Sequence, residues 1–281
     1  MGNYRDLEAG IATDFRERMS YGGYLQLDTL LAAQQPLSGQ HDELLFIVQH
    51  QVSELWLKLL IHELRAALAN VRRDELEPCF KILARVKLIQ QQLFNMWAVL
   101  ETLTPSEYAQ FRPALGQSSG FQSFQYRTLE FLLGNKHAGQ AEIFRHDPEQ
   151  HRQILADLAA PSLWDEFQRH LARRGFAIPA EHLERDLRQP YVAHSAVLEA
   201  LRLIYREPTE HWDAYEMAEK LLDVEEAFQL WRFRHMKTVE RVIGHRPGTG
   251  GSSGVGFLKK ALELCFFPEL IEVRTRMEDA S

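Results

Sequence analysis

The stretch that decides the fold is residues 42–68, DELLFIVQHQVSELWLKLLIHELRAAL. Apolar side chains recur in it every three or four residues, which is the repeat of an α-helix with one apolar face. Asp42 precedes the first of them, where a carboxylate can accept hydrogen bonds from the free N–H groups of a helix N-terminus. The stretch therefore predicts one long helix, capped by Asp42 and too long for a β-α-β crossover.

The same periodicity returns along the rest of the chain and predicts an all-α protein. A second long helix is expected over residues 74–103, with Pro78 in its first turn and Thr104–Pro105 ending it. Strand-like alternation bounded by Asn-Gly or Asp-Gly turns is absent from the sequence. Further helices are expected over residues 121–133, 149–158, 163–171, 193–205, 211–243 and 255–267.

Glycine and proline do not cluster strongly enough to divide the 281-residue chain into two domains. We expect a single large helical domain over residues 1–281, with a small helical insertion at about 137–190 that includes an excursion loop at 173–179. No segment repeats with a period of about 20 to 50 residues, which argues against a solenoid.

Composition narrows the function classes. Hydrophobic residues at 45% and charged residues at 25% are typical of a globular protein, and a net charge of −7 disfavours nucleic-acid binding. The two cysteines, Cys79 and Cys265, are far apart, so no disulfide framework, thiolate zinc cluster or covalent haem motif is expected. The N-terminus is charged where a signal peptide is apolar, and Glu54 and Lys58 interrupt the most apolar run. We expect a cytoplasmic protein that has no membrane span.

Two of the twelve histidines, His50 and His235, lie on the apolar sides of predicted long helices. A lone histidine in such a position is more often a core residue than a ligand or a catalytic group. In an all-α protein without thiolate ligands, however, one histidine in an apolar pocket is the usual way to hold non-covalent haem, and His235 suits that role. Arg232 and Arg234 beside it either pair with haem propionates or belong to a solvated helix face.

Three further features admit a functional and an ordinary interpretation. Arg112 lies at a helix break between two prolines, where it could bind a carboxylate ligand or form a surface ion pair. The glycine-rich segment 248–254 could close over a ligand, with Thr249 as the polar side chain that contacts it, or could be a plain linker. One helical face near the N-terminus could be a lid, an interface or ordinary core; its members are Tyr21, Tyr24 and Leu25.

Taken together, these stretches resemble the tryptophan 2,3-dioxygenase family over most of the chain. The related indoleamine 2,3-dioxygenases lack most of the shared blocks and are a poorer match. The blocks are YGGYLQLD at 21–28, HDELLFIVQHQVSELW at 41–56, FR at 111–112, SSGFQS at 118–123, WRFRH at 231–235, and IG at 243–244 with GTGG at 248–251.

The resemblance implies an oxidoreductase that opens the indole pyrrole ring of L-tryptophan with O2 to give N-formyl-L-kynurenine, the first step of tryptophan catabolism by the kynurenine pathway. It implies one haem b per subunit, ferrous in the active state, with His235 as the axial iron ligand. It also implies a homotetramer in which the N-terminal arm, residues 1–40, reaches a neighbouring subunit.

The resemblance assigns roles to single residues as well. His50 would be the catalytic residue near the indole N–H, Arg112 would bind the substrate carboxylate, and Thr249 would contact the amino-acid end of the substrate. The other implied site residues are Phe46, Ile47, Val48 and Gln49 in the pocket wall, Tyr108 beside Arg112, Ser119 and Trp97 near the haem, and Tyr21, Tyr24 and Leu25 in the pocket of a neighbouring subunit.

Two other classes of function are weighed against this one. A haem protein of different activity, such as a sensor or a peroxidase, would bind haem but would not need Arg112 and Thr249 around an amino acid. A non-catalytic helical scaffold would share the amphipathic helices and the flexible loop, and would take up no haem.

Overall fold

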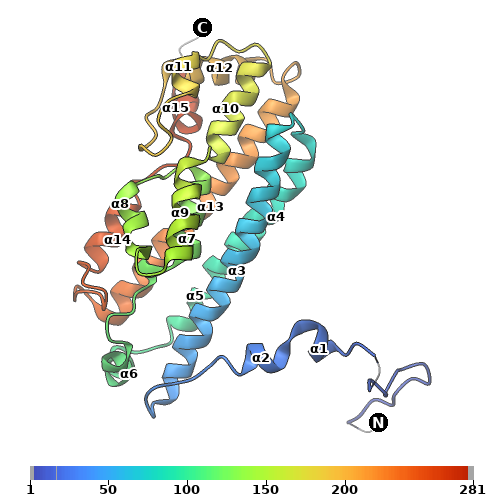
Figure 1. Ribbon diagram of the computed structural model, residues 1–281, viewed down its shortest axis with the longest axis vertical. Helices are drawn as coiled ribbons and strands as arrows, with labels where there is room; N and C mark the ends of the chain where they lie inside the picture. Colours follow the sequence, from blue (N-terminus) through green and yellow to red (C-terminus); the bar gives the residue numbers. More distant parts are fainter. Residues whose placement is uncertain (1–2, 17, 278–281) are drawn as a thin grey trace.

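The computed structural model describes residues 3–16 and 18–277, and every regular element in that part of the chain is a helix. The long helices α3 (His41–Arg72), α4 (Glu77–Asn95) and α13 (Trp212–Ile243) run side by side along the long axis of the molecule (Figure 1). Helix α4 packs against both of the others. The expected all-α fold is confirmed.

Shorter helices surround these three. They are α1 (Tyr21–Leu25), α2 (Leu27–Leu31), α5 (Trp97–Leu100), α6 (Pro105–Phe111), α7 (Phe124–Leu133), α8 (Ala138–Ala141), α9 (Pro148–Ala159), α10 (Leu163–Arg173), α11 (Ala180–Leu183), α12 (Ser195–Arg206), α14 (Val255–Ala261), α15 (Pro268–Arg276), and the 3-10 turns η1 (Arg112–Leu115), η2 (Gly120–Gln122) and η3 (Glu142–Phe144).

Helix α3 begins one residue earlier than predicted. Gln40 holds the N-cap position without a side-chain hydrogen bond, so the prediction that Asp42 is the cap is wrong. Asp42 lies in the first turn instead, where its negative charge is favoured by the helix dipole.

The predicted helix over 74–103 is two helices. Helix α4 begins at Glu77, with Pro78 in its first turn as expected, and α5 begins at Trp97 after Met96. Thr104 starts the next helix rather than ending this one: its Oγ1 accepts from Glu107 N at 3.3 Å, and Glu107 Oε2 accepts from Thr104 N at 2.8 Å. This capping box and the proline after it explain why α6 begins here.

At the C-terminal end, the helix predicted over 255–267 is too long. Helix α14 ends at Ala261, and α15, which was not predicted, begins at Pro268. Proline lacks a backbone N–H and is best tolerated at the start of a helix, so the chain breaks before it and resumes with it.

The core lies between the three long helices and continues to α10, α12 and α15. Leu60, Leu83 and Leu221 are fully buried where α3, α4 and α13 meet. Within the predicted insertion, α8 and α9 cover a separate small core with α7, made of Phe131, Ala141, Phe144, Ile154 and Leu158.

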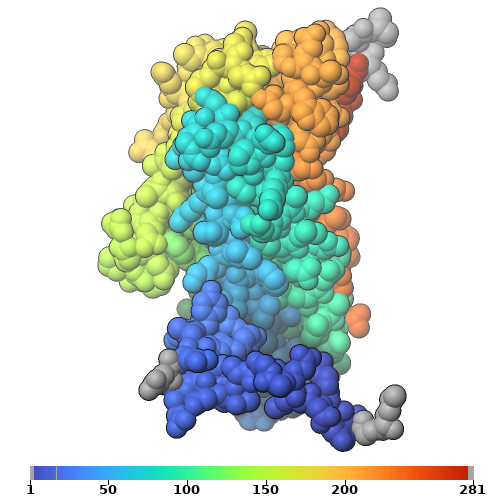
Figure 2. Space-filling model, turned by 90° about the vertical axis from the view of Figure 1, so that its right-hand side faces the viewer, coloured from blue at the N-terminus to red at the C-terminus, as the bar shows by residue number. Residues whose placement is uncertain are grey.

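The segment before α3 leaves the bundle. Helices α1 and α2 extend from one end of the long helices (Figure 1), and Figure 2 shows this blue segment across that end. Neither helix has a buried residue, and Tyr21 and Tyr24 are 77% and 75% exposed. In this chain, the face shared by the two tyrosines contacts no core.

Helix α3 is the one helix among the described residues that is long and apolar enough to cross a membrane by length and composition. The core helix of a soluble protein can have the same length and composition. Leu60, Leu64 and Val71 of α3 are buried against the other helices, while Leu44 and Leu55 remain 46% and 47% exposed.

A histidine holds α11 against α10. His182 Nε2 donates a hydrogen bond to Gln168 Oε1 at 2.8 Å, and its ring centroid lies 4.4 Å from that of His194. Burial lowers the pKa of His182 to about 4, and the nearby His194 and Arg185 act in the same direction. The fold therefore favours the neutral ring.

Acid is expected to weaken this contact. The folded pKa lies below the ordinary value of 6.5, so the stabilisation is complete above about pH 6.5 and is lost as the pH falls towards 4. His182→Gln keeps a donor but does not titrate. Its free energy of unfolding, measured in denaturant, should fall less between these pH values than that of the parent protein; parallel curves would contradict the assignment.

Candidate functional site

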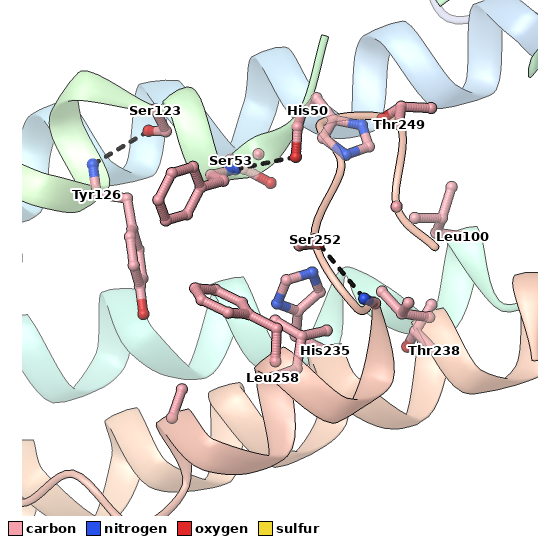
Figure 3. A pocket seen from close by; sticks show the side chains of 18 of the residues that line it. His50, Ser53, Leu100, Ser123, Tyr126, His235, Thr238, Thr249, Ser252 and Leu258 are labelled. Atoms are coloured by element: carbon pink, nitrogen blue, oxygen red, sulfur yellow. Dashed lines mark hydrogen bonds between the residues drawn. The ribbon is translucent and has the colours of Figure 1, made fainter. Parts of the chain in front are cut away.

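A cavity of about 300 Å³ opens between α3, α5, α7 and α13, beneath the loop 244–254, which contains the glycine-rich segment 248–254 and is called the glycine-rich loop below. Most of its lining is apolar, with a few polar groups, which is the usual character of a small-molecule site. His50 on α3 and His235 on α13 project into it from opposite sides (Figure 3). The helix packing thus brings together two histidines that lie far apart in the sequence.

His235 is held by two indole rings. Its ring stacks on Trp97 with centroids 4.7 Å apart, and on Trp231 with centroids 5.6 Å apart. No described residue forms a hydrogen bond with either ring nitrogen. Burial lowers the pKa of His235 to about 4, and His50 across the cavity acts in the same direction. The result is a neutral imidazole with a free nitrogen, which is the form that binds a metal.

His50 has a defined tautomer. Its Nδ1 lies 2.7 Å from Phe46 O, and because a carbonyl oxygen can only accept, Nδ1 carries the proton. Burial lowers the pKa of His50, so the ring is neutral and Nε2 is an acceptor. The cavity therefore presents a hydrogen-bond acceptor opposite the free imidazole of His235.

The glycine-rich loop is closed over the cavity. Arg112 Nη2 donates to Pro247 O at 2.7 Å, and Thr249 Oγ1 donates to Ser118 O. Gly250 lies so close to Ser119 that a Cβ at position 250 would be 2.7 Å from the Cβ of Ser119. The segment is therefore a wall of the cavity, and the plain-linker interpretation is not supported.

The predicted site residues fall into two groups. Those that line the cavity are Phe46, His50, Trp97, Tyr108, Ser119, Thr249 and His235. Phe46 and His50 are four residues apart and share one face of α3, whereas the residues between them point elsewhere. Ile47, Val48 and Gln49 accordingly do not line the cavity: Val48 is 40% exposed and Gln49 is buried.

The remaining predicted residues lie outside the cavity lining. Arg112 lies beside Tyr108 and binds the loop that covers the cavity. Burial raises the pKa of Tyr108, and the charge of Arg112 offsets part of that rise. Tyr21, Tyr24 and Leu25 are exposed on α1, in the arm that extends from one end of the long helices (Figure 1), and none of them lines the cavity.

Both arginines beside His235 are paired with glutamate carboxylates. Arg232 is 3% exposed and donates to Glu130 Oε1 at 2.9 Å, so it does not belong to a solvated helix face. Arg234 donates to both carboxylate oxygens of Glu101 at 3.0 Å. Neither guanidinium lines the cavity.

The cavity has polar residues that sequence reasoning missed. Arg127 and Glu130 on α7 and Gln140 on α8 belong to its lining. The available signal was a pair of opposite charges, three residues apart, within the helix predicted over 121–133. Gln140 lies in the predicted insertion, where no motif marked it.

The fold and the site define an all-α protein with a largely apolar small-molecule pocket, into which the half-buried His235 presents ring nitrogens that bind no described residue. The sequence model of the tryptophan 2,3-dioxygenase family matches residues 6–157 and 141–277. The chain belongs to this family and is an oxidoreductase that acts on tryptophan.

Similar proteins cover nearly the whole chain, and each is named tryptophan 2,3-dioxygenase. The one from Serratia proteamaculans is 62% identical over 98% of this chain and 99% of its own length. The one from Myxococcus xanthus is 61% identical over 98% and 95%, and the one from Kineococcus radiotolerans is 59% identical over 98% and 97%.

Proposed function

We propose that this chain is a cytoplasmic haem b enzyme that uses O2 to open the pyrrole ring of L-tryptophan, giving N-formyl-L-kynurenine. The observation that carries the proposal is the pair of neutral histidines that face each other across one apolar cavity. Family membership supports the substrate, and the geometry supports a role for each side chain.

The residues of the cavity fit a haem group. His235 would be the axial ligand, because its ring is neutral, held by Trp97 and Trp231, and without a partner among the described residues. Apolar walls would cover the porphyrin faces. When bound as ferrous haem, the iron supplies the activation of O2.

The chain's own residues would bind and orient tryptophan. Arg112 would exchange its contact with Pro247 O for the substrate carboxylate, and Thr249 would contact the amino-acid end from the same loop. His50 Nε2 would accept a hydrogen bond from the indole N–H, while Phe46 and Tyr108 form the wall beside it. The contribution of these groups is positioning and exclusion of water. A sensor or peroxidase would not need this set.

The arm supports a homotetramer. Tyr21, Tyr24 and Leu25 share one face of α1, are 77%, 75% and 41% exposed, and do not line the cavity of their own chain. Two large aromatic rings on a projecting helix are typical of a surface that another subunit covers. We propose that the arm, residues 1–40, reaches a neighbouring subunit, where this face completes the pocket.

The test is conversion of L-tryptophan by haem-loaded, reduced protein in aerated buffer, followed by the near-ultraviolet absorbance of N-formylkynurenine. Haem-dependent product is expected, with none from the haem-free protein. Protein that holds ferrous haem but forms no product would favour a sensor or peroxidase. Failure to take up haem would favour a scaffold.

Replacing His50 by alanine is expected to lower turnover and leave measurable activity. One hydrogen bond to the indole N–H would be lost, which corresponds to about tenfold in rate. Steady-state kinetics at matched haem content measure the effect. Loss of all turnover with haem intact would instead make His50 an essential base.

A further inference from the structure

A cationic cluster lies beneath one side of the cavity, outside the roles described above. It consists of Arg127 and Glu130 on α7 and Arg232 on α13. The three side chains are 4%, 5% and 3% exposed, in that order. Two guanidinium groups and one carboxylate are therefore buried together.

The two arginines differ in how completely they are bound. Arg232 donates to Glu130 Oε1 at 2.9 Å, to the carbonyl oxygens of Ala261 and Leu264 at 3.1 Å, and to Tyr126 Oη at 3.4 Å. Arg127 uses Nη1 alone, which donates to Glu130 Oε2 and to Gln140 Oε1. Its Nε is buried and has no hydrogen-bond partner, and its Nη2 makes no hydrogen bond to another residue within 3–16 and 18–277.

The charges of this cluster do not balance. Glu130 neutralises one of the two guanidinium groups, so one positive charge is left over. The other carboxylate in the cavity lining is Glu54, whose Oε2 accepts from Gln125 Nε2 at 2.8 Å and whose charge acts on His50. A buried charge without a partner is costly, so the cluster is suited to a ligand that brings a negative group.

We propose that Arg127 binds a carboxylate of the ligand in this cavity, and that this carboxylate is a haem propionate. The inference rests on the proposed function. Arg127 lines the cavity, whereas Arg232 and Arg234 are occupied by other partners. A guanidinium with two free donor positions matches the two oxygens of a carboxylate. Arg127 is thus a binding residue for the cofactor and takes no part in the chemistry.

The experiment measures the rate of haem transfer to excess apomyoglobin in tryptophan-free buffer. Arg127→Met should release haem at least about tenfold faster than the parent protein, and Arg127→Lys should lie between them, because lysine keeps the charge without the fork. Arg234→Met is the matched control and should release haem at the parent rate. Glu130 keeps Arg232 as a partner in Arg127→Met, so the apoprotein should fold, which its thermal unfolding midpoint checks.

A second measurement uses haem dimethyl ester, which has no propionate charge. The parent protein and Arg127→Met should release the ester at equal rates. If Arg127→Met accelerates release of both forms equally, Arg127 acts through packing and the inference is wrong. Unchanged haem release with a raised KM for tryptophan would assign the carboxylate to the substrate instead. If the parent protein takes up no haem at all, it is the proposed function that fails.

Discussion

His235→Ala is expected to remove haem retention and to lower turnover to the level of the haem-free protein. His235 would be the residue that holds the haem iron, and its stacking on Trp97 and Trp231 orients the imidazole. Its loss should leave the fold intact, because no described residue depends on His235 for a hydrogen bond. What remains is a larger apolar cavity.

Haem content after reconstitution, measured from the Soret absorbance per protein, tests this expectation. His62→Ala, at an exposed position of the same helix as His50, is the control and should bind haem normally. Added imidazole should restore part of the haem binding to His235→Ala by filling the vacated space. Full haem content in the alanine variant would show that another residue holds the iron.

Arg112→Ala is expected to lower kcat/KM for L-tryptophan by about 30-fold to 1,000-fold, which is the usual cost of truncating one member of a desolvated charge pair. Most of the effect should appear in KM, because the carboxylate contact exists in the bound ground state as well as during reaction. Arg112→Lys should recover part of the loss, since lysine keeps the charge but lacks the planar pair of nitrogens that binds both oxygens of a carboxylate.

Tryptamine separates the two contacts of Arg112. It lacks the carboxylate, so Arg112→Ala should change its turnover much less than that of tryptophan. The same guanidinium donates to Pro247 O and holds the glycine-rich loop. Equal losses for tryptophan and tryptamine would therefore show that Arg112 acts by holding the loop and does not bind the carboxylate.

The long helices could be predicted from sequence because their apolar repeat is strong. Helices α3 and α13 lie almost where the pattern placed them, at His41–Arg72 and Trp212–Ile243. The errors lie at the ends of helices, because a few local hydrogen bonds decide where a helix begins and stops. Thr104 was expected to end a helix but caps the next one, and the break at Met96 has no sequence signal.

Local periodicity and short motifs were enough to predict the all-α fold, the family and the candidate roles of His50, His235 and Arg112. Which side chains meet depends on how the helices pack, and that could not be read from the sequence. Position along a helix does not reveal which face a neighbouring helix covers, so Phe46 and His50 face the cavity while Val48 faces outward. The excess positive charge at Arg127 could not be predicted either. It arises because Glu130 of α7 accepts hydrogen bonds from both Arg127 and Arg232 of α13, and the sequence does not show that these three side chains meet.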